Sequence, residues 1–236
     1  MAFFQNLWEE LSSEFVSTFI EEQRYLLFLN GLKTTLIVAF AAAAMGVVLG
    51  FIIAYIRTTH DQTGHLRILN GLCKLYLTVI RGTPTMIQLL IMYFIVFGSV
   101  NVGKVPVAIL AFGINSGAYV AEIIRSGIQA VDKGQTEAAR SLGFKSGQTM
   151  RMVVLPQAIK NILPALGNEF VTVIKESSIV SVIGIADLMY QTNSVISTTY
   201  KSLASLAVAA IIYFIMTFFT SRLIAFAERK MANGTR

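Results

Sequence analysis

Long apolar stretches alternate with short polar segments along most of this 236-residue chain. A helix needs about 20 mostly apolar residues to cross the hydrocarbon core of a bilayer. Five stretches meet or approach this length, so each is predicted to be a membrane-spanning helix. They cover approximately residues 34–57, 82–99, 104–128, 153–175 and 202–227.

Two further segments have apolar positions that recur at helical spacing among charged residues. In residues 1–29 these positions include Leu7, Leu11 and Phe15, and the segment is acidic. This pattern predicts an amphipathic helix that lies on the outer membrane interface. Residues 66–80 have a similar pattern, and we expect a helix there on the inner interface.

The composition agrees with a membrane protein of one domain. Apolar residues make up 55% of the chain and charged residues only 14%, whereas a soluble domain carries roughly 25% charged residues. We therefore expect one transmembrane domain over residues 30–230, followed by a short tail at 231–236. A single cysteine, Cys73, excludes a disulfide within the chain and a cysteine-built metal site, and we expect no metal site.

The basic residues orient the predicted spans. Lys and Arg outnumber Asp and Glu between the first and second spans, between the third and fourth, and after the fifth. Because cytoplasmic loops are enriched in Lys and Arg, the N-terminus is predicted outside and the C-terminus in the cytoplasm. The net charge of +6 is thus interpreted as a topology signal, and we expect no nucleic-acid partner.

Polar residues in the third and fourth predicted spans lie at helical spacing, on one face of each helix. Polar groups inside a membrane are costly, so they face either a water-accessible pathway or a neighbouring helix. Glu169 has no basic partner on its own helix; it either meets the ammonium group of a solute, is protonated, or pairs across a subunit interface. The candidate pathway residues are Asn115, Tyr119, Asn161, Asn168, Glu169 and Thr172.

Three charged residues are interpreted as structural. Glu122 lies near the inner end of the third span, at the same depth as Arg81 at the start of the second, and Arg125 is one turn away. Residues three apart on a helix are neighbours. We therefore expect ion pairs from Glu122 to Arg81 and Arg125.

A short helix is predicted between the third and fourth spans. Asp132, together with Gln135, is a suitable N-terminal cap, and Gly143 suits the left-handed position that ends a helix. The result is a helix of about nine residues, roughly 14 Å long. It is either a docking element for another protein or a structural surface helix.

The wider pattern around this helix resembles a known family. Glu137-Ala138-Ala139, then Gly143, then Val153 and Leu155-Pro156 resemble the EAA loop of ATP-binding-cassette importer permeases. Further motifs resemble the polar amino acid branch of that family, which handles histidine, glutamine, glutamate, arginine and opines. They are Arg81-Gly82-Thr83-Pro84, Asn115-Ser116-Gly117-Ala118-Tyr119 with Glu122 and Arg125, Asn168-Glu169-Phe170, and Lys175-Glu176-Ser177-Ser178.

The resemblance implies an all-α type I importer permease fold in a bacterial cytoplasmic (inner) membrane. Residues 132–152 would form the coupling loop, whose helix docks on a cytoplasmic ATPase. Implied partners are two ATP-binding-cassette ATPase subunits, a second permease subunit, identical or related, and an external amino-acid-binding protein. The coupling residues implied are Glu137, Ala138, Ala139, Leu142 and Gly143.

The chain is not expected to be an enzyme. It contains no Gly-x-x-x-x-Gly-Lys-Ser/Thr phosphate-binding loop, so ATP would be used by the partner subunit, and no cofactor is expected on this chain. The alternative function is a stand-alone secondary carrier or channel for small polar solutes. Such a carrier would be driven by an ion gradient without ATP, which distinguishes the two hypotheses.

Overall fold

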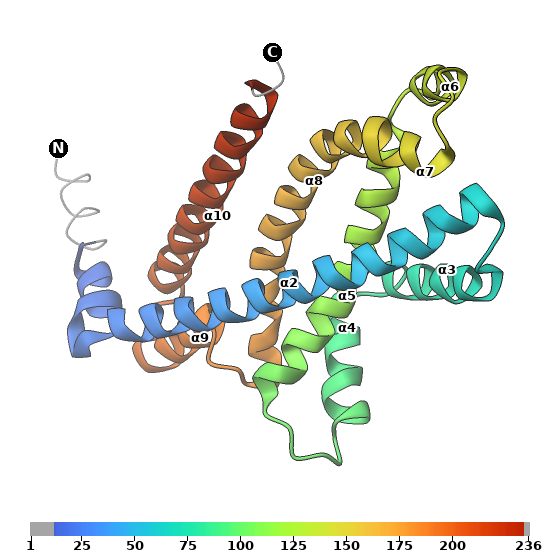
Figure 1. The fold of residues 1–236 in the computed structure, drawn as a ribbon. Helices are drawn as coiled ribbons and strands as arrows, with labels where there is room; N and C mark the ends of the chain where they lie inside the picture. The colour runs from blue at the N-terminus through green and yellow to red at the C-terminus, as the bar shows by residue number, and fades with distance from the viewer. Residues whose placement is uncertain (1–11, 234–236) are drawn as a thin grey trace.

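The computed structural model describes residues 12–233, which contain helices and no β-strand. Three of the helices are long and apolar enough to cross a membrane. They are α2 (Tyr25–Thr63), α5 (Lys104–Gln129) and α10 (Ser202–Asn233). These helices coincide with the first, third and fifth predicted spans (Figure 1).

The second predicted span, 82–99, contains a helical segment over residues 85–96 that is bent relative to the helix before it. The helix before it is α3 (Arg67–Arg81), which was predicted to lie on the inner interface, and α4 (Thr85–Leu90) and the π-helical η3 (Ile91–Val96) follow. The two parts are bent by 107°, and they form a fourth candidate span only if counted as a bent pair. Pro84 explains the break, because proline lacks an N–H group and disfavours helical geometry in the residue before it.

The fourth predicted span corresponds to η4 (Met150–Val154) and α8 (Leu155–Glu176). Its length is sufficient for a span, but hydropathy does not identify it as one. Polar and charged residues together lower its hydropathy, among them Lys160, Asn161, Asn168 and Glu169. The count of five spans therefore stays a prediction.

The segment before α2 is shorter than the sequence suggests. Residues 12–15 are α-helical and continue into the π-helical η1 (Val16–Ile20), so the described part of the predicted amphipathic segment is helical up to residue 20. The turn η2 (Glu21–Gln23) follows, and α2 already begins at Tyr25. Residues 25–29 thus belong to the first long helix. Leu7 and Leu11 lie outside the described residues.

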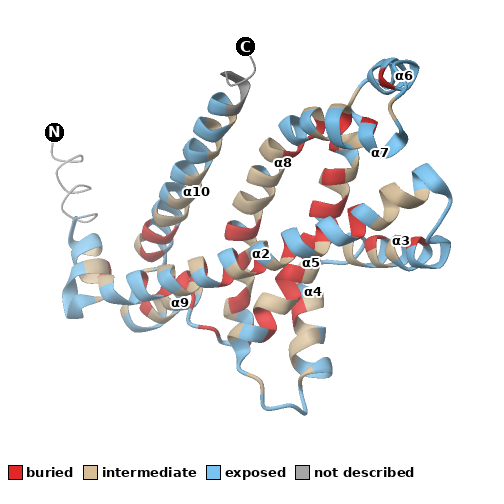
Figure 2. Cartoon of the chain, viewed as in Figure 1, coloured by how far each residue is buried: buried red, intermediate tan, exposed pale blue. Residues whose placement is uncertain are grey.

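The centre of the fold is the contact between α2 and α5, and Figure 2 shows buried residues along both helices there. Glycines make this contact close. A Cβ atom added to Gly46 would lie 2.9 Å from the Ser116 side chain, and one added to Gly50 would lie 2.5 Å from Val120 Cγ1. Because real Cβ atoms do not approach neighbours this closely, larger residues there would force the two helices apart.

The remaining helices lie at the two ends of the fold. Helices α6 (Lys133–Ser141) and α7 (Ser146–Thr149) project beyond the last turn of α5. The turn η5 (Ser177–Ile183) and helix α9 (Leu188–Thr199) connect α8 to α10 at the opposite end. Figure 1 shows that the last turns of α10 lie at the same end as α6.

Asp187 caps α9 from a buried position. Its Oδ1 atom accepts a hydrogen bond from the Tyr190 N–H at 2.9 Å, whereas Oδ2 is buried without a hydrogen-bond partner. The next residue, Leu188, donates its N–H to Thr35 Oγ1 of α2 at 3.1 Å. Burial raises the pKa of the Asp187 carboxyl from 3.8 to about 6, because the charged form loses hydration.

This raised pKa predicts a pH-dependent stability. The folded state retains the proton to a higher pH than the unfolded state, so stability falls as the pH rises from about 4 to about 6, by up to about 3 kcal/mol. Asp187→Asn keeps an oxygen for the Tyr190 N–H and carries no charge. We expect this variant to be more stable than wild type at pH 7.5 and to lose the dependence in that window, as measured by unfolding in detergent between pH 4 and pH 8. Parallel profiles for the two proteins would contradict the assignment.

Candidate functional site

Four helices position the polar residues that the sequence singles out. The tight α2–α5 contact fixes α5, whose C-terminal half carries Tyr119, Glu122 and Arg125. Helix α8 packs beside α5 and carries Asn161, Asn168 and Glu169. The α3–α4 bend brings Arg81 towards the same part of α5.

Glu122 is the centre of an ion-pair cluster. Its Oε1 atom lies 2.6 Å from Arg125 Nη2, and its Oε2 atom lies 3.8 Å from Arg81 Nη1. A third partner comes from α2, where Arg57 Nη1 lies 3.4 Å from Glu122 Oε2. One carboxylate thus connects α2, α3 and α5.

The candidate pathway residues of α5 have different surroundings. Asn115 is buried and donates a hydrogen bond from Nδ2 to Gln88 Oε1 of α4 at 3.0 Å. It therefore connects α5 to α4 within the chain. Tyr119, one turn later, is 38% exposed, and the Arg81 guanidinium lies 5.7 Å from its ring centroid. Of the two, Tyr119 alone presents its side chain to the surface of the chain.

The candidate residues of α8 lie at the chain surface or close to it. Asn161 and Asn168 are exposed, and Thr172 is half-buried with its hydroxyl bonded to the Asn168 carbonyl at 3.1 Å. Glu169 is half-buried, and its Oε1 atom accepts a hydrogen bond from Ser116 Oγ of α5 at 2.8 Å. The Glu169 carboxylate therefore has a partner from a neighbouring helix, and its Oε2 atom is left for other contacts.

Helix α6 has the ends that the sequence predicts. The Asp132 side chain accepts from the Gly134 N–H at 2.6 Å, and Gly143 has a left-handed φ of 88°. The Gly143 N–H bonds the Arg140 carbonyl at 3.0 Å, and the Phe144 N–H bonds the Ala139 carbonyl at 3.1 Å. This paired arrangement is the Schellman motif that closes helices at a glycine.

The implied coupling residues divide between two faces of the α6 segment. Glu137, Ala138 and Gly143 are exposed, and Leu142 is exposed to 79%. Ala139 is 5% exposed, so its side chain packs inside this chain instead of facing a partner. A large apolar side chain as exposed as Leu142 is suited to a protein contact.

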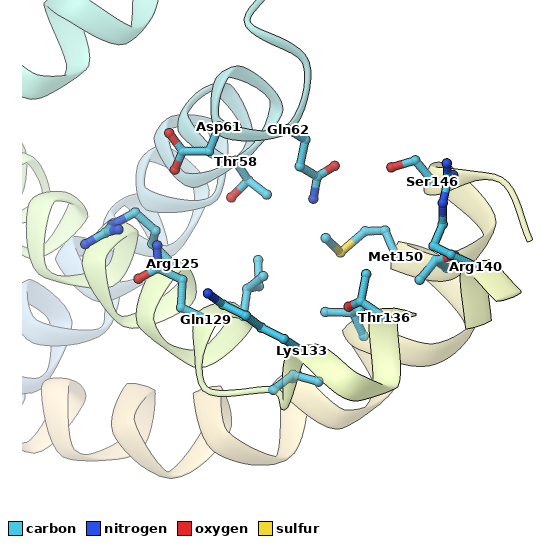
Figure 3. A pocket seen from close by; sticks show the side chains of 14 residues that line it. Thr58, Asp61, Gln62, Arg125, Gln129, Lys133, Thr136, Arg140, Ser146 and Met150 are labelled. Atoms are coloured by element: carbon cyan, nitrogen blue, oxygen red, sulfur yellow. The ribbon is translucent and has the colours of Figure 1, made fainter. Parts of the chain in front are cut away.

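A cavity of about 480 Å³ lies at the base of α6, between it and the last turns of α2 and α5. Figure 3 shows Lys133 extending from α6 towards Gln129 at the end of α5. On its other sides, α6 packs on α7 and η4. Helix α6 is thus held mainly by the segment that leads into α8.

No group of three or more His, Cys, Asp or Glu side chains that would hold a metal ion occurs among residues 12–233. The sequence reasoning also missed several partners. Arg57 and Gln88 were not singled out, and Ser116 was named only as part of a motif, although each bonds a residue that was a candidate. The available signal was their position inside, or at the end of, predicted spans, because a polar group in a membrane requires a partner.

Comparison with known proteins gives a consistent result. The family model described as "binding-protein-dependent transport system inner membrane component" matches residues 46–233. The chain is 38% identical over 208 residues to the arginine transport system permease protein ArtQ of Bacillus subtilis strain 168, covering 87% of this chain and 93% of that protein. It is 34% identical over 208 residues to the glutamine transport system permease protein GlnP of Escherichia coli K12, with the same coverage.

Solved structures agree. A chain of a crystal structure of an amino acid ABC transporter with histidines superposes with a TM-score of 0.81 at 47% identity, covering 87% of this chain and 94% of that one. A chain of the MetNI methionine ABC transporter, in an inward-facing conformation, superposes with a TM-score of 0.69 at 20% identity, covering 92% and 100%. At that low identity the second likeness indicates a shared fold alone.

Proposed function

Because the chain belongs to the family of binding-protein-dependent transport system inner membrane components, we propose that it is the permease subunit of an ATP-driven importer of polar amino acids. The observation that carries this proposal is the exposed, doubly capped α6 helix with Leu142 at its end. A helix of this kind is suited to dock on a separate protein. The similarity to amino acid permeases supplies the substrate class.

The proposal includes the topology and the partners. Five spans place the N-terminus outside and the C-terminus in the cytoplasm of a bacterial inner membrane. Helix α6 and the last turns of α10 lie at the same end of the fold (Figure 1). This supports the arrangement, since both segments would be cytoplasmic. Two ATPase subunits, a second permease subunit and an external binding protein complete the importer; this chain binds no cofactor and leaves ATP hydrolysis to its partner.

The mechanism follows from how α6 is attached. ATP-driven closure of the two ATPases displaces α6, and η4 passes the movement to α8. The exposed residues Tyr119, Asn161 and Asn168 then lie on the surface between two permease subunits. Rigid-body displacement of such helices exposes that surface alternately to the two sides of the membrane.

The alternative is a stand-alone carrier, and reconstitution distinguishes the two. The chain, purified from its native membrane with its co-purifying proteins, is placed in vesicles and tested for amino acid uptake. We expect uptake that requires ATP hydrolysis and an external binding protein. Full uptake driven by an ion gradient, without ATP and with no co-purified ATPase, would refute the proposal.

Glu169 provides a test of substrate contact. Its free carboxylate oxygen is suited to the ammonium group of an amino acid, because a charge-assisted hydrogen bond is worth about 1.5–3 kcal/mol. We expect Glu169→Gln to lower the uptake rate by about tenfold or more. The glutamine still offers an oxygen to Ser116, so the stability of the protein is expected to change little.

Ser116→Ala is the matched control, because it removes the internal hydrogen bond and leaves the Glu169 charge. It is expected to lower stability by about 1 kcal/mol with a smaller loss of uptake than Glu169→Gln. The opposite order of the two uptake losses would assign Glu169 to structure instead of substrate contact.

A further inference from the structure

A second cavity, of about 490 Å³, lies between α2, α3 and α5. Four cationic side chains and one carboxylate line it, which gives a formal charge of 4 − 1 = +3. The five residues are Arg57, Lys74, Arg81, Arg125 and Glu122.

Among residues 12–233, the positive charge of this cavity is only partly balanced: Glu122 is the one carboxylate that lines it, and Asp61 lies close enough to act on Arg125. Glu122 is shared by all three arginines. Arg57 Nε is buried without a hydrogen-bond acceptor. Lys74 forms no ion pair with the acidic residues among those described. The cavity therefore has unused donors and a net positive potential, both of which favour an anion.

An exposed apolar stripe on α3 borders the cavity. Leu72, Leu75 and Val79 are 58%, 61% and 49% exposed, whereas Leu77 packs inwards against α5. Residues three apart on an α-helix are neighbours on its surface, so Leu75 adjoins the cavity-lining Thr78. Leu72 and Val79 lie further round α3, away from Lys74. A helix with this arrangement lies in the membrane interface with its apolar stripe towards the acyl chains.

We propose that this cavity binds the headgroup of an anionic phospholipid whose acyl chains cover the α3 stripe. The phosphate accepts hydrogen bonds from the more exposed Lys74 and Arg81. The more buried Arg57 adds positive charge to the cavity. A soluble phosphate would match the cations but leave the stripe uncovered. Basic pockets beside cytoplasmic helix ends are known to suit anionic lipid headgroups. The assignment to the cytoplasmic leaflet rests on the proposed topology.

The site has a consequence for the pathway surface. Arg81 reaches both this cavity and the ring of Tyr119, which is the exposed candidate residue of α5. A bound headgroup would hold the Arg81 guanidinium and thereby the orientation of Tyr119. Lipid composition would then influence transport through one side chain.

The test is lipid retention by the full-length chain, measured by native mass spectrometry after purification from mixed phosphatidylglycerol and phosphatidylcholine. Wild type is expected to retain phosphatidylglycerol preferentially. Lys74→Glu is expected to reduce that retention by about tenfold, since each cation near the surface contributes about 1 kcal/mol and the reversal also adds a negative charge. Arg67→Glu is the matched control, because it makes the same charge change on an exposed residue of α3 that does not line the cavity; retention is expected within about twofold of wild type.

Three results would overturn the proposal. They are equal losses in Lys74→Glu and Arg67→Glu, equal retention of the two lipids by wild type, and displacement of the lipid by millimolar inorganic phosphate, which would indicate a soluble anion site. Size-exclusion profiles verify that both variants are folded. If Lys74→Glu is not folded, Lys74→Gln replaces it, and its retention of phosphatidylglycerol is expected to be about fivefold lower than that of wild type. Lipid retention needs neither ATP nor substrate, so its failure leaves the proposed transport function untouched.

Discussion

Gly143→Val is expected to reduce ATP-driven uptake by about 5- to 30-fold while the protein still inserts and its ATPase partner still hydrolyses ATP. Gly143 has a φ of 88°, a conformation that costs a residue with a side chain about 1–2 kcal/mol. A Cβ atom there would meet nothing within 4 Å, so the cost is conformational and not steric. Valine avoids this conformational cost by leaving the left-handed region. The change breaks the two hydrogen bonds of the Schellman motif at the end of α6 and moves Leu142.

Two further variants isolate this effect. Gly143→Asn is expected to retain most uptake, because asparagine tolerates the left-handed region. Gly147→Val places the same side chain in α7, where a Cβ atom also meets nothing within 4 Å and φ is not positive. Uptake and ATP hydrolysis are measured together in vesicles. Normal uptake by Gly143→Val, or equal losses at both glycines, would contradict a coupling role for α6.

Glu122→Gln is expected to destabilise the protein by about 2–4 kcal/mol. Removing one partner of a buried ion pair typically costs about 3–5 kcal/mol, and partial exposure reduces this. The side chains of Glu122 and Arg57 are 25% and 14% exposed. Within the described part of the chain, the three arginines therefore lose the one carboxylate that they share, in a mostly desolvated place. Unfolding in detergent, followed by circular dichroism, measures the change.

The control for this variant is Glu137→Gln, which neutralises an exposed carboxylate of α6 and is expected to change stability by less than about 0.5 kcal/mol. The double variant Arg57→Gln with Glu122→Gln is expected to recover part of the loss, because it also removes the stranded charge. Additive losses in the double variant would show that Arg57 and Glu122 are not coupled.

The sequence predicts the elements whose determinants are local. The apolar cores of α2, α5 and α10 follow from hydropathy alone, and α6 follows from Asp132 at its start and Gly143 at its end. The sequence also separates residues 66–80 from the 82–99 segment, and α3 and α4 lie on the two sides of Pro84. The 107° bend between them could not be predicted, because it depends on the backbone angles at the break.

The candidate site is less predictable because its contacts join distant segments. Helical periodicity placed Asn115 and Tyr119 on one face of α5, but it does not tell which neighbour covers that face. Gln88 covers Asn115, while Tyr119 stays exposed. Likewise, Arg57 lies 65 residues before Glu122, and no spacing rule connects two side chains on different helices.

The attachment of α6 determines which parts of the fold can move together. It rests on η4, which continues into α8, whereas the 480 Å³ cavity separates it from the last turn of α2. Helices α2 and α5 contact each other closely at glycines, so we expect them to move as one unit. Under the proposed function, a displacement of α6 by the ATPase would then pass through η4 and tilt α8 relative to that unit.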